Sequence, residues 1–389
     1  MPRVIRWRSG EVTAIRRTWP GAAELDVRVT EGGPTSDDPR ADSAVGTGQR
    51  AQGSEENGDR TCRALAYTDL VGRPEKGDRV LLNTTALDMG LGTGGYAMVV
   101  ALPDRLPPDP DPAPGHLVKA RYTPLQTTVL GADEQDSPHH ALLRDADGVD
   151  GMPVVTADLH SALPAILAGV HDSGPEARVV YVMLDGGALP AAFSRSVAGL
   201  REAGLLAATV TVGQAFGGDL ETVTVHTGLL AARHILGADV AIVTQGPGNL
   251  GTGTPWGFSG VAAGEAVNAA AALGGHAVAA LRVSEADPRE RHRGVSHHSL
   301  TAYGRVALAP ADVVVPQLPG AFGTRVRSQA APLAERHLVV EVPVDGLRQT
   351  LKDLPVHLST MGRSLDGDAA YFLAAAAAGR HAASLIAPS

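Results

Sequence analysis

The stretch Arg178-Val-Val-Tyr-Val-Met-Leu184, followed by Asp185-Gly186-Gly187, decides the fold of this chain. An uninterrupted apolar run rich in β-branched residues is typical of a strand that is buried on both faces. The acidic residue and the two glycines after it predict a turn at the end of that strand. Comparable short apolar runs occupy residues 153–156, 207–212, 239–244 and 276–283.

Longer amphipathic segments separate these runs and are predicted as helices. They occupy residues 159–171, 189–203, 222–236 and 261–273. Buried strands that alternate with helices indicate a parallel sheet with crossover helices on its faces. Further strands are expected at 312–315 and 337–342, and an Ala-rich helix at about 368–385. We therefore expect an α/β domain with a mainly parallel sheet over residues 116–389, which would carry the functional site.

The first hundred residues have a different pattern, in which apolar and polar residues alternate in short runs. This alternation predicts half-buried strands, and we expect residues 1–102 to form a small β-barrel or sandwich domain. Within it, residues 31–60 contain Val45 as their one large aliphatic residue and are interpreted as a disordered insertion. Residues 103–115 include six prolines and are interpreted as an extended linker.

Composition excludes several classes of protein. The chain has 389 residues, of which 44% are hydrophobic, and its net charge of −9 argues against a general affinity for nucleic acid. A single cysteine, Cys62, excludes an intrachain disulfide framework and a zinc site built from several thiolates. No apolar run reaches the ~18 residues of a membrane span, and the first residues lack the apolar core of a signal peptide. We expect a cytoplasmic protein with no membrane or nucleic-acid partner.

Acidic residues and glycines follow two of the predicted strands. Ligands of open parallel sheets bind at the carboxyl ends of the strands, near a switch in strand order. Asp185 and Asp219 are therefore catalytic candidates that would orient a histidine, although turn formation and helix capping explain them equally simply. Asp158-Leu-His160 follows the 153–156 strand and is a lesser candidate for the same crevice. Glycines that would let a ligand approach the backbone are Gly186, Gly187, Gly217 and Gly218.

A glycine-rich loop, Gln245-Gly-Pro-Gly-Asn-Leu-Gly-Thr-Gly-Thr-Pro-Trp-Gly257, lies between a strand and a helix. Exposed amide N–H groups in such a loop can cradle an anion. Residues 246–251 also match the dinucleotide pattern G-x-G-x-x-G, but the helix begins too late and Glu285 follows too far along the chain. A nicotinamide cofactor is therefore the less favoured interpretation. The candidate ligand-binding residues of this loop are Gly246, Gly248, Asn249, Gly251, Thr252, Gly253 and Thr254.

The segment 284–299 combines three histidines, three arginines and three acids after a central strand. Two chemistries suit it. Imidazoles and a carboxylate could bind a divalent metal such as zinc or manganese, although the spacing matches no standard metal motif. Alternatively, the arginines could hold a phosphate or carboxylate while His297 or His298 acts as general acid or base. The candidate metal ligands are His292, His297, His298 and Asp287. The candidate anion-binding arginines are Arg289, Arg291 and Arg293.

Several long motifs resemble a bacterial family known as domain of unknown function 3866. The resemblance covers nearly the whole chain apart from residues 31–60. The motifs that carry it lie at 80–86, 90–96, 119–126, 185–190, 215–219, 251–254 and 287–298. The family implies no activity, cofactor or catalytic residue, so the functional expectation rests on the residues themselves.

Taken together, the residues favour an enzyme that acts on a small anionic metabolite by hydrolysis or group transfer. The site is expected in a crevice formed by residues 185–187, 213–219, 245–260 and 285–298. A nicotinamide-dependent oxidoreductase is one alternative, and a non-catalytic metabolite sensor or scaffold is another. The His/Arg run is also a candidate subunit interface of a homodimer.

Overall fold

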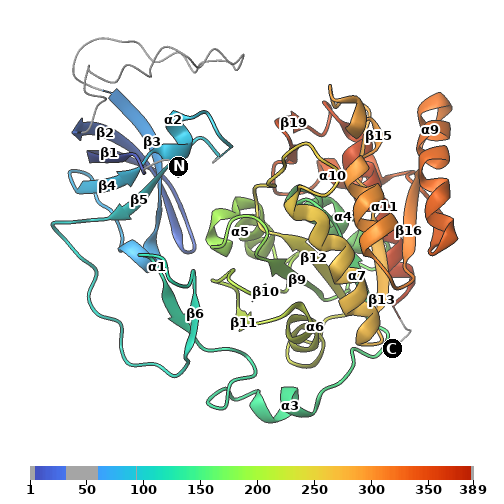
Figure 1. Ribbon diagram of the computed structural model, residues 1–389, viewed down its shortest axis with the longest axis horizontal. Helices are drawn as coiled ribbons and strands as arrows, with labels where there is room; N and C mark the ends of the chain where they lie inside the picture. Colours follow the sequence, from blue (N-terminus) through green and yellow to red (C-terminus); the bar gives the residue numbers. More distant parts are fainter. Residues whose placement is uncertain (1–4, 32–59, 93, 387–389) are drawn as a thin grey trace. The chain divides into compact units, whose positions relative to one another are not determined.

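The computed structural model of the protein describes residues 5–31, 60–92 and 94–386 (Figure 1). The chain divides into two compact units, Met1–Pro112 and Ala113–Ser389, and the division falls within the proline-rich segment. The predicted disordered insertion at 31–60 lies, apart from its two end residues, outside the described residues. Among the helices of the described part, none is long and apolar enough to cross a membrane.

The first unit is a closed five-stranded barrel with the strand order β1-β2-β3-β5-β4, as predicted. Strands β3 and β5 pair in parallel, whereas the other neighbours, including the closing pair β1 and β4, are antiparallel. Alternate side chains such as Val12, Leu25 and Leu82 fill the interior. The elements are β1 (Trp7–Trp19), β2 (Ala22–Glu31), β3 (Arg60–Tyr67), α1 (Thr68–Val71), β4 (Arg79–Asn83), α2 (Thr85–Asp88) and β5 (Ala97–Ala101).

Cys62 lies in β3 and packs beside the barrel core. Burial raises the pKa of its thiol to about 11. The thiol is therefore protonated at neutral pH, and because the thiolate is the reactive form, Cys62 is unsuited to nucleophilic chemistry.

The second unit is built on an eight-stranded sheet with the order β11-β10-β9-β12-β8-β13-β16-β17. All neighbouring strands are parallel, which confirms the predicted architecture. The central strands are buried along their whole length because helices cover both faces. The strands are β8 (Pro153–Thr156), β9 (Val179–Leu184), β10 (Ala208–Val212), β11 (Leu220–Thr222), β12 (Val240–Gln245), β13 (His276–Ala280), β16 (Asp312–Gln317) and β17 (Leu338–Pro343).

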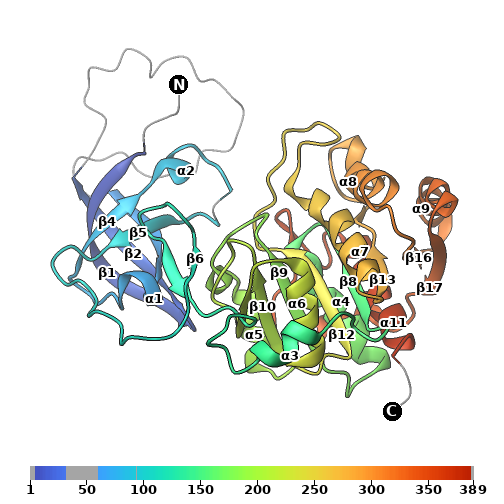
Figure 2. The same cartoon turned by 60° about the horizontal axis from the view of Figure 1, so that its bottom comes forward.

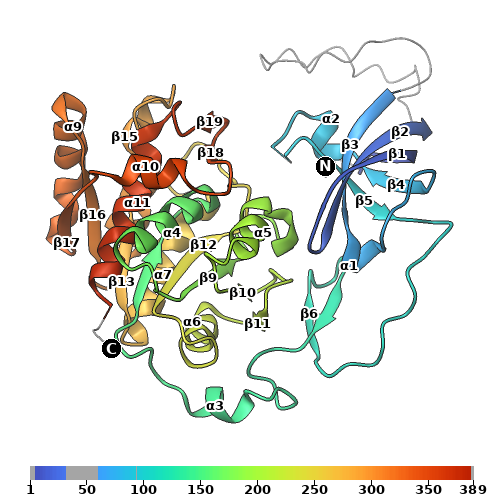
Figure 3. The ribbon, with the colours of Figure 1, turned by 180° about the vertical axis from the view of Figure 1, so that it is seen from behind.

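Two groups of helices cover the two faces of this sheet (Figures 2 and 3). The first group is α6 (Val225–His234), α7 (Ala262–Ala272) and α9 (Gly320–Ala330). The second group is α4 (Leu163–Ser173), α5 (Arg195–Glu202), α10 (Leu347–Lys352) and α11 (Ala369–Ser384). The remaining short elements are β6 (Leu117–Lys119), β7 (Thr127–Val129), α3 (His140–Asp145), β14 (Val283–Ser284), β15 (Gly294–Val295), α8 (His297–Thr301), β18 (Ser359–Thr360) and β19 (Arg363–Ser364).

Two predicted helices begin later than expected, and each begins at a hydroxyl side chain. Helix α5 starts at Arg195 because the Ser194 hydroxyl accepts the Val197 N–H. Helix α6 starts at Val225 because residues 220–222 form strand β11, and the Thr224 hydroxyl then accepts the Thr227 N–H. The predicted capping of this helix by Asp219 is therefore wrong.

Strands β8 and β12 lie side by side at the centre of the sheet, and the chain continues from them to opposite faces of the sheet. The chain leaves β8 through α4 on one face and runs to β9, whereas it leaves β12 through α7 on the other face and runs to β13. This is a topological switch point, where ligands of open parallel sheets bind beyond the carboxyl ends of the strands.

Helices α4 and α11 cross with their backbones in contact. A Cβ atom on Gly169 would lie 1.8 Å from the Ala376 carbonyl oxygen, and one on Gly379 would lie 1.9 Å from the Ile166 carbonyl oxygen. The two glycines thus allow the small-residue face of α11 to pack directly on α4.

We predict that Gly169→Ala lowers the free energy of unfolding by about 3 kcal/mol, because the methyl group forces the helices apart. Gly174→Ala, at the end of the same helix, is the matched control, since a Cβ there meets its neighbours at 3.6 Å. Chemical denaturation monitored by circular dichroism measures both variants. Equal stability of the two variants would contradict the prediction.

Candidate metal centre

The switch point is tied together by the side chain of Gln245, the last residue of β12. Its Nε2 donates to the backbone oxygen of Asp158, just beyond β8, at 2.6 Å, and to the Asn249 Oδ1 at 2.9 Å. Asp158 and Gln245 are both buried. The two central strand ends and the start of the glycine-rich loop are therefore held as one piece.

Three histidines gather beside this point, all from the segment that follows β13. His292 ends a short 3-10 turn, and His297 and His298 begin helix α8. Ser296 joins them: its hydroxyl accepts the backbone N–H of His298 and lies 2.8 Å from the Nδ1 of His292. One ring nitrogen of each histidine lies within 4.8 Å of the other two. Nitrogens bound to one zinc ion lie about 3.3 Å apart for Zn–N bonds of ~2.05 Å, so small side-chain shifts suffice to bind it.

In His292 and His298, contacts at Nδ1 leave Nε2 as the available nitrogen. The Nδ1 of His292 faces Ser296, and the Nδ1 of His298 lies 3.4 Å from an Nη atom of Arg282. The ring of His298 is fixed by Phe258, which stacks on it with centroids 3.8 Å apart and planes 2° from parallel. The Nε2 of His297 is buried and finds no hydrogen-bond partner among the described residues.

Two of these histidines, His292 and His297, are held in the neutral form. Burial, assisted by the positive charge of Arg282 and Arg289, lowers the pKa of His292 to about 3. Burial, together with His298 and nearby arginines, lowers the pKa of His297 to about 4. A neutral imidazole keeps the lone pair that a metal requires. His292 and His297 are therefore better suited to binding a metal than to donating a proton at neutral pH.

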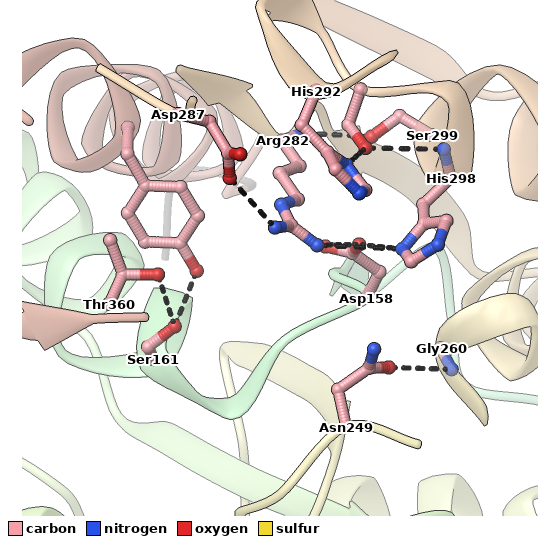
Figure 4. A network of polar contacts seen from close by, with 12 residues as sticks. Asp158, Ser161, Asn249, Gly260, Arg282, Asp287, His292, His298, Ser299 and Thr360 are labelled. Atoms are coloured by element: carbon pink, nitrogen blue, oxygen red, sulfur yellow. Dashed lines mark hydrogen bonds and ion pairs between the residues drawn. The ribbon is translucent and has the colours of Figure 1, made fainter. Parts of the chain in front are cut away.

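A network of arginines and aspartates lies beside the histidines, and Figure 4 shows its buried members Asp158, Arg282 and Asp287. Arg282 lies between Asp158 and Asp287, with closest nitrogen–oxygen distances of 3.8 and 3.7 Å. Arg363 extends the network from Asp287, at 3.4 Å, to Asp368, at 3.0 Å. With Arg289, which binds Asp287, the network contains three positive and three negative groups and is neutral overall.

Asp287 is taken up by this network and does not join the metal cluster. Although burial opposes its ionisation, Arg289 binds both carboxylate oxygens at 2.9 Å and holds the pKa of Asp287 well below its usual range. In the described part of the chain, the ligand atoms that lie together are those of the three histidines. The predicted fourth ligand is thus a partner of arginines in this structure.

The predicted arginine clamp is not assembled as one unit. Arg289 is bound to Asp287, and the exposed Arg293 lies 3.9 Å from Glu290. Arg291 is exposed and close to Gly253 of the glycine-rich loop, where an Nη atom lies 3.8 Å from the position of an added Cβ. Of the three, Arg291 is the one placed beside that loop without an ion pair among the described residues.

The glycine-rich loop satisfies many of its own polar groups. Asn249 is its organiser, because its Oδ1 also accepts from the Ser259 hydroxyl and the Gly260 N–H, each at 3.3 Å. The hydroxyls of Thr252 and Thr254 lie 3.1 Å apart. Amides that already donate within the protein are those of Gly246, Leu250, Thr252, Gly257, Phe258, Ser259 and Gly260. The loop is therefore a less open anion cradle than the sequence predicts.

Several of the predicted ligand-binding glycines serve loop packing. A Cβ on Gly187 would lie 2.2 Å from the Gly246 oxygen, and one on Gly246 would lie 2.3 Å from the Ala188 oxygen. A Cβ on Gly186 would meet the Gln245 side chain at 2.9 Å. Gly248 and Gly253 have positive φ angles of 95° and 84°, as turns require, whereas Gly251 pairs with Phe258 in an isolated bridge.

The two aspartates predicted to orient a histidine lie away from the cluster. Asp185, exposed at the end of β9, accepts the Gln214 N–H at 2.9 Å. Asp219 lies beside the beginning of β10, where it accepts the Thr209 N–H and binds Arg201, both at 2.7 Å. Four strand spacings of ~4.8 Å separate β10 from β13, about 19 Å in all. The structure therefore does not support a catalytic role for Asp219 at the histidines.

The two glycines before Asp219 also use their N–H groups in hydrogen bonds within the protein. The Gly217 N–H donates to Glu221 at 2.6 Å, and the Gly218 N–H donates to the Thr211 hydroxyl at 3.1 Å. Glu221 in turn lies 3.3 Å from the buried Lys119. This end of the sheet is a buried polar network that fixes the edge strand β11.

Sequence reasoning missed Arg282 and Phe258 and ranked Asp158 low. Arg282 follows the apolar run of β13 with one residue between, and a charged residue at such a strand end is a signal that could have been used. Phe258 gives no comparable signal, because only the fold places its ring on His298.

We predict that Arg282→Met lowers the free energy of unfolding by about 3 kcal/mol at pH 7, because it leaves Asp158 buried without its counter-ion. Arg293→Met is the control, since this exposed side chain makes one long ion pair and its loss should change stability by less than about 0.5 kcal/mol. Urea denaturation measures both. A stability of the Arg282 variant equal to wild type would refute the argument.

The His160 side chain is expected to make the free energy of unfolding depend on pH. Its ring bridges the Tyr181 hydroxyl at 3.0 Å and the Ser194 hydroxyl at 2.7 Å, and burial lowers its pKa from 6.5 to about 4. The unfolded chain therefore binds the proton more tightly, and the stability due to neutral His160 is present above pH 6.5 and lost as the pH falls towards 4. The loss amounts to at most about 3 kcal/mol.

The comparison of wild type with His160→Gln isolates this contribution. Unfolding free energies measured from pH 7 to pH 4 should fall more steeply for wild type than for the variant. Parallel pH profiles of the two proteins would contradict the prediction, because they would show that His160 has the same pKa in the folded and the unfolded chain.

Comparison with known proteins places the chain in a family. Residues 63–379 match a family model described as "Protein of unknown function (DUF3866)", as the motifs predict. No curated protein and no solved structure matches the chain. Because the match spans most of the chain, the protein belongs to the DUF3866 family.

Proposed function

We propose that this protein is a metal-dependent enzyme that hydrolyses a small anionic metabolite, or transfers a group from it, at the three-histidine centre. The observation that carries the proposal is the convergence of one ring nitrogen from each of His292, His297 and His298 within 4.8 Å. The cluster lies beside the residues that join β8 and β12, the position at which ligands of such sheets bind.

The ligand set suits a catalytic metal more than a structural one. Catalytic zinc sites use three protein ligands and keep a fourth position for water, whereas structural sites close all four positions. Three imidazoles, with the Asp287 carboxylate bound to Arg289, match the open arrangement. A bound metal would lower the pKa of its water to about 7 and so supply hydroxide at neutral pH.

The charges around the centre support an anionic substrate. The charges of the surrounding arginines and aspartates balance, so a divalent ion would give the centre two uncompensated positive charges. Exposed Arg291, beside the glycine-rich loop, adds a further positive group. For hydrolysis, His292, His297 and His298 would hold the ion, which would supply an activated water and polarise the electrophilic group of the substrate.

The loop geometry does not favour the nicotinamide alternative. In the dinucleotide fold the glycine motif opens directly into a helix whose N-terminus holds the pyrophosphate. Here Gly246 and Gly251 precede α7 by many residues, because that helix begins at Ala262. The glycines are used instead to pack two loops together.

We predict that the untagged protein binds close to one equivalent of a divalent transition metal, and that His297→Ala/His298→Ala binds none. Elemental mass spectrometry after dialysis measures the metal. Turnover of small phosphate and carboxylate esters should require the metal and disappear on treatment with a chelator.

His226→Ala/His357→Ala is the matched control, because both side chains are exposed and lie outside the cluster. It should retain metal and fold. Metal-free wild-type protein after incubation with Zn²⁺, Mn²⁺ or Co²⁺ would overturn the proposal. Metal and anion binding without turnover would favour a sensor.

A further inference from the structure

We infer that Asp158 is the positioning residue that holds His298 in its metal-binding tautomer, an inference that rests on the proposed function. The Oδ2 atom of Asp158 lies 3.8 Å from the Nδ1 of His298. It is buried and has no hydrogen-bond partner among the described residues. A buried carboxylate oxygen without a donor, facing a histidine ring, is an unfilled half of a hydrogen bond.

The backbone around Asp158 is fixed on two sides. Gln245 binds its carbonyl oxygen, and Gly260 approaches so closely that a Cβ there would lie 2.9 Å from the Asp158 Cβ. On the other side of the gap, Phe258 stacks on His298 and restricts the plane of its ring. The carboxylate and the imidazole are therefore presented to each other by rigid parts of the site.

The contact between Arg282 and His298 corresponds to the tautomer that is unsuited to ligation through Nε2. An Nη atom of Arg282 lies 3.4 Å from the His298 Nδ1, and because arginine is always a donor, this contact places the imidazole proton on Nε2. A metal at Nε2 requires the proton to be on Nδ1. A protonated Nδ1 can no longer accept a hydrogen bond from the guanidinium.

Asp158 supplies the acceptor that this exchange needs. When the proton moves from Nε2 to Nδ1, the imidazole remains neutral and Nδ1 becomes a donor. A shift of about 1 Å brings Nδ1 within hydrogen-bond distance of the Oδ2. Figure 4 shows Asp158, Arg282 and His298 grouped together, so the same guanidinium that releases Nδ1 stays beside the carboxylate and balances its charge.

The test compares the Zn²⁺ affinity of wild type, Asp158→Asn and a matched control, measured by competition with a chromophoric chelator. Loss of a carboxylate behind a ligating histidine weakens metal binding by about 10- to 100-fold. We expect that loss in Asp158→Asn, with the stoichiometry of one ion retained. The control is Asp312→Asn, because Asp312 is also buried and binds His276 and His381 at the opposite, amino-terminal end of the strands. Its Zn²⁺ affinity should equal that of wild type.

A second measurement reads the tautomer in the wild-type protein itself, so the inference stays testable even if a variant does not fold. Long-range ¹H–¹⁵N spectra of histidine-labelled protein distinguish protonated from unprotonated ring nitrogens. We expect the His298 proton on Nε2 without metal and on Nδ1 with Zn²⁺, with the signals assigned by comparison with His298→Gln.

The outcomes separate this inference from the proposed function. If wild type binds no Zn²⁺, the proposed function fails and the inference fails with it. If wild type binds Zn²⁺ and Asp158→Asn binds it equally tightly, or if His298 keeps its proton on Nε2 in the loaded protein, only the inference fails. Loss of one ion from Asp158→Asn at saturating Zn²⁺ would instead make Asp158 a direct ligand and overturn the positioning role.

Discussion

The buried guanidinium of Arg282 is the interaction on which the candidate site depends. Charged groups are stable in a protein interior only where opposite charges and hydrogen bonds compensate them. Arg282 lies between Asp158 and Asp287, and Arg363 continues the chain of charges to Asp368. These residues come from the end of a central strand, from the loop after β13 and from the β18–β19 hairpin with the start of α11. The need to pair buried charges therefore holds together segments that are far apart in the sequence, and the three histidines are placed within that frame.

The architecture was predictable because its signals are local. Apolar runs without interruption mark β8, β9 and β12, and the alternation in the first unit marks its barrel strands. The three histidines were also within reach, since they lie within seven residues of one another. Asp219 was misplaced because three-residue β11 has too little pattern to be recognised, and a helix was expected there instead. Two contacts connect segments that are distant in the sequence: the pairing of Asp158 with Arg282 and the stacking of Phe258 on His298. The hydrophobic pattern of a sequence does not indicate such contacts.

The glycines also show what the sequence alone does not reveal. A glycine-rich loop at a strand end suggests close approach of a ligand, but close approach of another part of the protein requires the same residue. Gly187 and Gly246 allow two loops to touch through their backbones, and Asn249 uses its amide oxygen to gather the loop around itself. The sequence pattern was therefore a sound indicator of a constrained backbone, while the partner of that backbone became evident only in three dimensions. The histidines are more informative because a buried imidazole nitrogen without a hydrogen-bond partner among the described residues, such as the Nε2 of His297, has few structural uses.

The contact between α4 and α11 also constrains the order in which the second unit is built during synthesis. Helix α4 follows the first strand of the sheet, whereas α11 spans residues 369–384, and the two helices meet backbone to backbone at Gly169 and Gly379. The face of the sheet that α11 covers is consequently incomplete while the ribosome is still making residues 174–368. The barrel of the first unit draws its strands from residues 7–101 and needs no such late partner. A nascent chain thus holds a finished barrel and an open, apolar sheet at the same time, and exposed apolar surface of this kind is prone to aggregation until α11 has been made.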